Sequence, residues 1–188
     1  MSTPGPQAAL PAESWAAYSG AIDQTCVQRF VVGFTAASVQ KVKKIHLYFH
    51  SSGGNVGDGI ALYELFRAIP IDLTLYNPGV VASIATIAYL GANHRKTSAH
   101  AVFGLHRTRY TAGQPATAGT LKSLAEAATI DDARTEAIVR ANTTLPAEKW
   151  AYMDQYDLTL TAEDAVAYGF ADEIVAFQPP PGAAVYGI

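Results

Sequence analysis

Ser83 is the residue in this sequence whose setting most suggests reactive chemistry. It follows the turn Asn77-Pro78-Gly79 and begins an uncharged apolar stretch that ends at Gly91. We expect this stretch to form a short helix, and the backbone N–H groups of a helix's first turn have no intrahelical partner and create a positive field. Ser83 is therefore either a helix cap, which contributes roughly 1 kcal/mol, or a nucleophile. Position alone favours the cap.

Two other predicted strands end in residues that suit a site near Ser83. The segment Ile45–His50 is almost continuously apolar and aromatic, as buried parallel strands are, and it runs into Ser51-Ser52-Gly53-Gly54. Paired glycines before a helix can point backbone N–H donors above the sheet, although an ordinary glycine turn has the same composition. The segment Ala101–Leu105 is a third buried strand that ends at His106. Because function in open α/β sheets collects outside the carboxyl ends of strands, we expect His106 on the same edge as Gly54 and Ser83.

Several classes of site are disfavoured by what the sequence lacks. The glycine turn has neither the Gly-Lys-Ser/Thr ending of a phosphate loop nor the spacing of a dinucleotide fingerprint. Cys26 is the only cysteine, so neither an intrachain disulfide nor a cysteine-rich metal site can form, and we expect it to be a small core residue. We predict no cofactor and no metal.

Composition sets similar bounds on partners. The chain has 188 residues, 49% of them apolar, which is enough for one domain with a full core. Its net charge of −3 gives no basic excess for nucleic acid. The uncharged segment 73–93 is broken by the Asn-Pro-Gly turn and is too short to span a membrane. The N-terminus lacks the features of a signal peptide, so we expect a cytoplasmic protein with neither a nucleic-acid nor a membrane partner.

The sequence predicts one α/β domain between two irregular ends. Residues 1–13 form a flexible arm, residues 14–177 the domain and residues 178–188 a Pro-rich tail that is extended or disordered. Periodicity predicts helices over 23–38, 56–69, 118–142 and 146–155, strands over 45–50, 71–76, 101–105 and 173–177, and a capping box from Thr161 to Asp164. The segments from 45 to 90 form a right-handed βαβ unit with the Ser83 turn at a strand's end.

The helix over 118–142 is long for so small a domain. We expect it to protrude and to pack against another subunit or against its own sheet, which predicts self-association. Its polar residues are interpreted as a solvated face: Lys122, Glu126, Asp131, Asp132, Arg134 and Glu136.

Four motifs in order resemble a known family. They are Ser-Ser-Gly-Gly-Asn-Val after one strand, Gly-Val-Val-Ala-Ser-Ile-Ala after the next, a histidine that ends a third, and Asp-Leu-Thr-Leu-Thr-Ala-Glu-Asp-Ala-Val-Ala-Tyr-Gly-Phe-Ala-Asp near the end. Together they resemble the proteolytic subunit of the Clp protease, within the Clp/crotonase superfamily. The likeness runs from Tyr18 to Val175.

This resemblance implies a Clp/crotonase-like ββα superhelical fold with a protruding long helix, and a serine peptidase that cleaves peptides or unfolded proteins through an acyl-enzyme. It implies that Ser83 is the nucleophile, His106 the general base and Asp157 the carboxylate that orients the histidine, with Asp154 and Asp164 as nearby alternatives. The backbone N–H groups of Gly54 and Ile84 match the oxyanion hole, which reverses the preference for Ser83 as a cap.

The resemblance also implies a homo-oligomer, a heptameric ring or double ring, and an AAA+ unfoldase as partner. The chain departs from the family pattern at Ser52, where proline is usual, at Arg107-Thr108, where Gln-Pro is common, and at Ala85, which replaces a frequent glycine. The leading arm shows no counterpart of the family's axial loops. These departures weigh against the unfoldase more than against the triad.

Three alternative functions share parts of this pattern. A Ser/Lys peptidase of the signal-peptide-peptidase type would use Lys122 as its base, because a buried lysine can be neutral. A crotonase-like acyl-CoA enzyme would hold a thioester oxyanion with the same two amides, Gly54 and Ile84. A catalytically silent subunit would assemble with an active relative.

Overall fold

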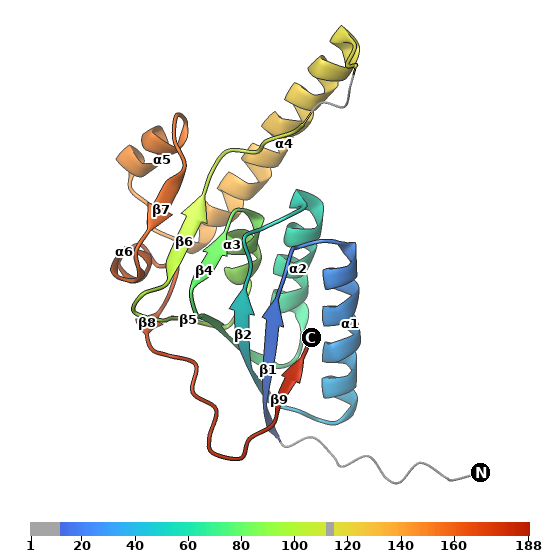
Figure 1. Ribbon diagram of the computed structural model, residues 1–188, viewed down its shortest axis with the longest axis vertical. Coiled ribbons are helices and arrows are strands. Elements are labelled where there is room, and N and C mark those ends of the chain that lie inside the picture. The colour runs from blue at the N-terminus through green and yellow to red at the C-terminus, as the bar shows by residue number, and fades with distance from the viewer. Residues whose placement is uncertain (1–11, 112–114) are drawn as a thin grey trace, which may run out of the picture.

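A computed structural model describes residues 12–111 and 115–188 of the chain, so the predicted arm lies outside the described residues except for its last two. Two β-sheets carry the fold (Figure 1). The larger sheet is parallel and has six strands in the order β8-β5-β3-β2-β1-β9. Its strands are β1 (Glu13–Ser19), β2 (Lys44–His50), β3 (Asp72–Asn77), β5 (His94–Thr97), β8 (Glu173–Ile174) and β9 (Val185–Gly187). This mixed α/β architecture is the fold class that the sequence predicts.

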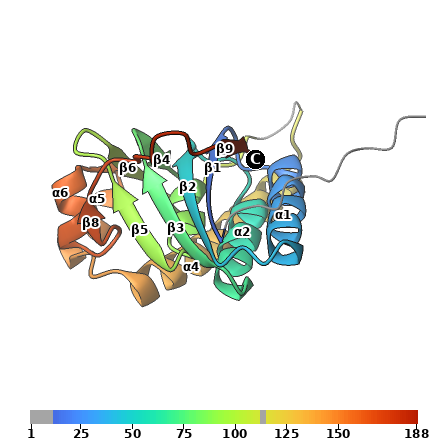
Figure 2. The same cartoon turned by 90° about the horizontal axis from the view of Figure 1, so that it is seen from below.

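Helices α1 (Gln24–Val39) and α2 (Val56–Ala68) cover one face of the larger sheet (Figures 1 and 2). Both begin where the sequence provides a cap: Asp23 accepts from Cys26 N at 2.8 Å, and Asn55 accepts from Gly57 N at 3.0 Å. Phe30 of α1 and Phe66 of α2 pack edge-to-face, with ring centroids 5.2 Å apart. Cys26 is buried in this core, as predicted.

The opposite face of the larger sheet has an aromatic layer of its own. Trp15 stacks on His46 with ring centroids 4.1 Å apart, and Phe177 packs edge-on against Trp15 and Tyr76. Phe177 is followed by the Pro-rich tail, whose last residues form β9 beside β1. The proline run over 178–182 lies outside any strand, whereas the end of the tail, which the sequence does not predict as a strand, pairs with the sheet. With β1 starting at Glu13, the sheet extends beyond both ends of the predicted domain.

The smaller sheet holds the segment around Ser83. Its order is β4 (Val80–Ala82), β6 (Val102–Leu105) and β7 (Leu158–Leu160), with β4 and β6 parallel and β7 antiparallel to β6. The prediction of a single sheet edge is therefore wrong in one respect. The turn after β3 leads into β4 of a second sheet, and Ser83 and His106 follow neighbouring strands of that sheet.

The remaining helices flank the smaller sheet. They are α3 (Ile84–Tyr89), α4 (Ala118–Asn142), α5 (Ala147–Met153) and α6 (Ala162–Ala167). Helix α3 is buried along its whole length, and α6 begins with the predicted capping box between Thr161 and Asp164. In the part of the chain that is described, no helix is long and apolar enough to cross a membrane.

Helix α4 has the predicted bounds and projects away from the sheets (Figure 1). Its exposed part carries apolar side chains, with Leu121 52% and Ile130 60% exposed. The predicted solvated face is wrong at Asp131, which is only 8% exposed, and at Glu136, which forms ion pairs with Arg107 and Arg140. These acids face the rest of the molecule because the strand-to-helix loop after β6 packs along α4. Other charged members of the predicted face are exposed as predicted: Lys122, Glu126 and Arg134.

Candidate active site

Ser83 lies between β4 and α3 in a backbone conformation that residues other than glycine rarely adopt. Its φ is 56° and its ψ is −134°. Its N–H donates to Gly104 O at 2.8 Å, which ties it to β6. The hydroxyl forms no capping hydrogen bond to α3, so the cap interpretation does not hold. Strained residues of this kind cost on the order of 1–3 kcal/mol and cluster at active sites.

The glycine turn after β2 packs directly against Ser83. Gly53 has φ +107°, and a Cβ built on it would lie 3.0 Å from Ser83 Oγ. Gly54 is equally confined, since its Cβ would lie 2.1 Å from Ile22 O. Ile22 also fixes the turn through hydrogen bonds with Gly53 O at 3.0 Å and Asn55 N at 2.8 Å. This strand-to-helix turn therefore packs directly against Ser83, and glycine is needed at both positions.

Two backbone donors are left without acceptors at this point. Within residues 12–111 and 115–188, the N–H groups of Gly54 and Ile84 form no hydrogen bond. Both residues line the same cavity as Ser83 and His106, a hollow of about 200 Å³. Thr86 holds α3 in place, because its hydroxyl lies 3.0 Å from Val81 O and 3.1 Å from Gly104 O. The cavity therefore brings a hydroxyl, an imidazole and two free amides together.

His106 follows β6 directly and is half-buried. Its Nδ1 lies 2.7 Å from Arg107 O. A carbonyl oxygen only accepts hydrogen bonds, so Nδ1 carries the proton and Nε2 has a free lone pair when the ring is neutral. That tautomer is the one that a general base acting through Nε2 requires.

Asp157 precedes β7 and stands apart from this group. Its carboxylate forms an ion pair with Arg109, and the two side chains are 55% and 66% exposed. It lines a hollow next to the cavity of Ser83, together with Arg109. The structure thus brings Gly54, Ser83, Ile84 and His106 into one cavity, whereas the carboxylate of Asp157 faces an arginine.

The two alternative aspartates have other partners. Asp154 accepts from Arg107 Nε at 2.9 Å, and Asp164 accepts from the Thr161 N–H in the capping box of α6. Lys122, the alternative base, is 79% exposed on the projecting helix, 3.9 Å from Glu126. Nothing removes its ammonium group from water, so it lacks the burial that a neutral lysine needs.

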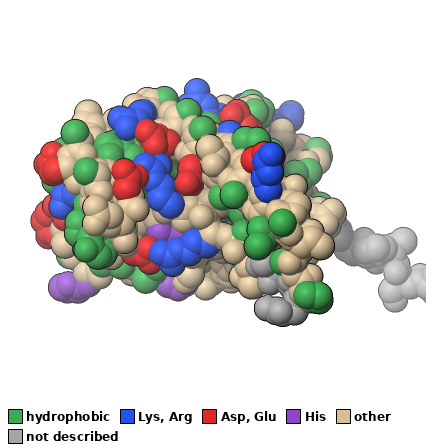
Figure 3. Space-filling model, turned by 90° about the horizontal axis from the view of Figure 1, so that it is seen from above, with side chains coloured by type: hydrophobic (Ala, Val, Ile, Leu, Met, Phe, Trp, Pro, Cys, Tyr) green, Lys and Arg blue, Asp and Glu red, His purple; other side chains and the backbone are tan. Residues whose placement is uncertain are grey.

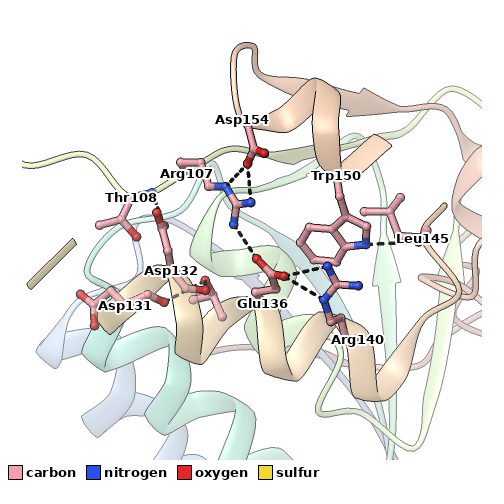
Figure 4. Close-up of polar contacts among 10 residues, drawn as sticks. Arg107, Thr108, Asp131, Asp132, Glu136, Arg140, Leu145, Trp150 and Asp154 are labelled. Carbon is pink, nitrogen blue, oxygen red and sulfur yellow. Dashed lines mark hydrogen bonds and ion pairs between the residues drawn. The ribbon is translucent and has the colours of Figure 1, made fainter. Parts of the chain in front are cut away.

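One side of the cavity, called the α4 wall, is lined by Arg107, Asp132 and Glu136, which belong to a network of charged side chains (Figure 4). Arg107 donates to Glu136 of α4 at 2.8 Å and to Asp154 after α5. Arg140 also donates to Glu136, at 2.8 Å, and its guanidinium lies 4.3 Å from the ring centre of Trp150. The hydrogen bond from Arg107 is the main cause that lowers the pKa of Glu136 below its ordinary value.

The loop after His106 is fastened to α4 at two further points. Thr108 N donates to Asp132 at 2.7 Å, and the Tyr110 hydroxyl donates to Asp131 at 2.6 Å. On the face of the molecule seen in Figure 3, basic and acidic side chains are interspersed rather than gathered by sign. The sequence alone does not predict this wall. The one residue that could have indicated it is Arg107, because the family that the chain resembles commonly has an uncharged residue at that position.

The chain matches known proteins over most of its length. A family model described as Clp protease matches residues 7–178. The ATP-dependent Clp protease proteolytic subunit 3 of Rhodococcus jostii (strain RHA1) is 27% identical over 161 residues, covering 84% of this chain and 79% of that protein. Subunit 4 of the same organism is 33% identical over 141 residues, covering 71% and 69%.

A solved structure shares the fold. It is that of a ClpP1 point mutant from Listeria monocytogenes, which superposes with a TM-score of 0.73 at 19% sequence identity and covers 87% of this chain and 91% of its own.

Proposed function

Because the chain belongs to the Clp protease family, we propose that it is a serine peptidase that cleaves peptides through an acyl-enzyme on Ser83. One observation carries this proposal: the strained Ser83 presents an uncapped hydroxyl to a cavity that also holds His106 and two unpaired backbone N–H groups. A serine hydroxyl becomes a useful nucleophile when a neighbouring base takes its proton, and the cavity supplies that base.

The proposed reaction proceeds in two halves. His106 Nε2 removes the proton from Ser83 Oγ while the oxygen attacks the peptide carbonyl carbon, and the N–H groups of Gly54 and Ile84 donate to the resulting oxyanion. Collapse of the tetrahedral intermediate breaks the C–N bond, and the imidazolium gives its proton to the departing amine. Water then attacks the ester by the same route and releases the acid and the serine. Each oxyanion donor contributes roughly 3–4 kcal/mol in known enzymes.

Asp157 is the proposed third member, and strand register supports it. Leu105 of β6 is paired with Leu158 of antiparallel β7. Continued by one residue, this register sets His106 opposite Asp157, and directly opposite residues have side chains on the same face of a sheet. This register supports Asp157 as the proposed partner of His106, and its carboxylate binds Arg109 in this structure.

We also propose that the protein self-associates into a ring and resides in the cytoplasm. Exposed apolar residues on the projecting half of α4 support self-association. The words ATP-dependent in the names of the relatives describe those proteins. The departures at Ser52, Ala85 and Arg107 weigh against extending an AAA+ unfoldase partner to this chain.

Labelling with a fluorophosphonate, which reacts with activated serines, tests the nucleophile. We expect the wild type to be labelled on Ser83, and Ser83→Ala and His106→Ala to lose the label, while Lys122→Ala keeps it. A control serine hydrolase in the same tube shows that the reagent is active. Equal labelling of wild type and Ser83→Ala would remove the assignment, and loss in Lys122→Ala with retention in His106→Ala would point to the Ser/Lys alternative. A silent subunit would not be labelled.

A further inference from the structure

We propose that Arg109 is a positioning residue that decides whether Asp157 serves His106, so that the resting chain keeps its triad open. This inference rests on the proposed function and names a control that acts on it. The expected hydrogen bond of the triad joins His106 Nδ1 to the Asp157 carboxylate. Each end is occupied by a different group in the structure: Arg107 O at His106 Nδ1, and Arg109 at Asp157.

The register of β6 and β7 favours a meeting of the two triad members. Leu105 pairs with Leu158 at the end of the ladder, and the next residues of the two segments are His106 and Asp157. Two contacts separate this arrangement from a closed triad: Asp157 binds Arg109 on the loop after β6, and His106 Nδ1 binds Arg107 O. Closing the triad therefore requires the Asp157 carboxylate to leave Arg109 and His106 Nδ1 to exchange the carbonyl for that carboxylate.

Arg109 is held much less firmly than the other arginine at this site. Arg107 is 30% exposed and binds carboxylates from two segments, Glu136 and Asp154. Arg109 is 66% exposed, and Asp157 is its one ion-pair partner among residues 12–111 and 115–188. Exposed ion pairs are weak and are screened by salt. Asp157 can therefore leave Arg109 readily, whereas Arg107 stays fixed.

The position of Arg109 links the two hollows. It lines the cavity that holds Ser83 and His106, and it also lines the neighbouring hollow that holds Asp157. A substrate that enters the cavity meets Arg109, whereas Glu136 and Asp132 on the α4 wall already have partners. A bound substrate or a change in salt that draws Arg109 away would release Asp157 toward His106.

The test measures the second-order rate of fluorophosphonate labelling of Ser83, which needs no knowledge of the peptide substrate. The set comprises wild type, Arg109→Gln, Asp157→Asn and the double variant, each at low and high NaCl. The matched control is Lys44→Gln, which removes another exposed ion pair, to Asp72 at 3.7 Å, at the far end of β2.

We expect Arg109→Gln to raise the labelling rate about threefold at low salt, the scale of a weak exposed ion pair. Wild type should approach the rate of Arg109→Gln as salt rises, because screening frees Asp157. In the Asp157→Asn background the Arg109 substitution should change nothing, since no carboxylate remains to be released. Lys44→Gln should keep the rate and the salt response of the wild type.

Two results overturn the inference alone. In one, Ser83 is labelled but Arg109→Gln leaves the rate unchanged or lowers it. In the other, Arg109→Gln raises the rate equally with and without Asp157, which means that the arginine acts only through shape or reagent access. If no variant is labelled while the control hydrolase is, the proposed function fails, and the inference fails with it.

Discussion

Gly53 lies so close to Ser83 that any side chain on residue 53 would displace the serine. A Cβ on Gly53 would lie 2.6 Å from Ser83 Cβ, and the φ of Gly53 is +107°. Gly53→Ala is therefore strained twice, by backbone conformation and by collision with the serine. We expect it to lower the labelling rate of Ser83 by more than about tenfold and to lower the free energy of unfolding by roughly 1–2 kcal/mol. Urea denaturation measures the second effect.

Gly33→Ala is the matched control for this substitution. Gly33 lies within α1, and a Cβ there would meet nothing within 4 Å. Alanine is the better helix former, so this variant should gain up to about 1 kcal/mol of stability and keep full labelling. A Gly53→Ala protein that labels as fast as Gly33→Ala would contradict the close packing of Gly53 against Ser83.

Ser83→Gly should make the protein more stable and inactive at once. The φ of 56° at Ser83 is costly for a residue with a Cβ and free for glycine. We expect the free energy of unfolding of Ser83→Gly to be about 1 kcal/mol higher than that of wild type. Ser83→Ala keeps the Cβ, so its free energy of unfolding should match that of wild type. Equal stability of the two variants would show that the conformation stores no strain.

The sequence predicted the parts of the fold that periodicity and capping specify. The bounds of α4 and the capping box at Thr161 were correct because each depends on residues close together in the chain. Several strands were missed for physical reasons. Strand β5 reads His-Arg-Lys-Thr and looks like a polar loop, β4 has only three residues, and β9 follows a proline run. These strands form because long-range pairing overrides weak local preference.

The sequence also placed the groups that meet in the cavity, but not their charged partners. Ser83, His106, Gly54 and Ile84 each lie just beyond a strand, so the topology of parallel strands brings them together. The partners of Arg107 and Arg109 depend on the register of β7 and on the path of the loop along α4. Neither the register nor the loop path can be predicted from residues close together in the chain. The polar pattern of the helix therefore predicts a solvated face for Glu136.

Arg107 should matter for catalysis because it anchors the loop that follows His106. Its guanidinium is bound by Glu136 of α4 and by Asp154. We expect Arg107→Ala to lower the labelling rate about tenfold, because the loop loses these anchors and His106 its fixed position in the cavity. Arg107→Lys keeps the charge but not the forked geometry of the guanidinium, so its labelling rate should lie between those of wild type and Arg107→Ala. Arg140→Ala, on the far side of Glu136, is the control, and an equal loss there would mean that the whole wall is only structural.

The exposed apolar residues of α4 should mediate self-association. Light scattering at micromolar concentration should show a mass several times that of the 19.9 kDa chain. Leu121→Glu combined with Ile130→Glu should lower this mass, because both side chains are more than half exposed on the projecting helix. Val32→Glu is the control, because Val32 is exposed on α1 to 69%. A monomeric wild type would contradict the proposal of a ring.

His46 should make the protein less stable in mild acid. Burial lowers the pKa of its imidazole below the ordinary value, partly opposed by the hydrogen bond to Glu13. The unfolded chain therefore binds a proton at a higher pH than the native chain does, so the contribution of His46 to stability is complete above about pH 7 and falls as the pH drops through about 6.5. Urea denaturation at several pH values should show a smaller fall for His46→Gln than for wild type, and an unchanged fall for His100→Gln, which alters an exposed histidine. Equal falls in all three proteins would show that His46 is not the group responsible.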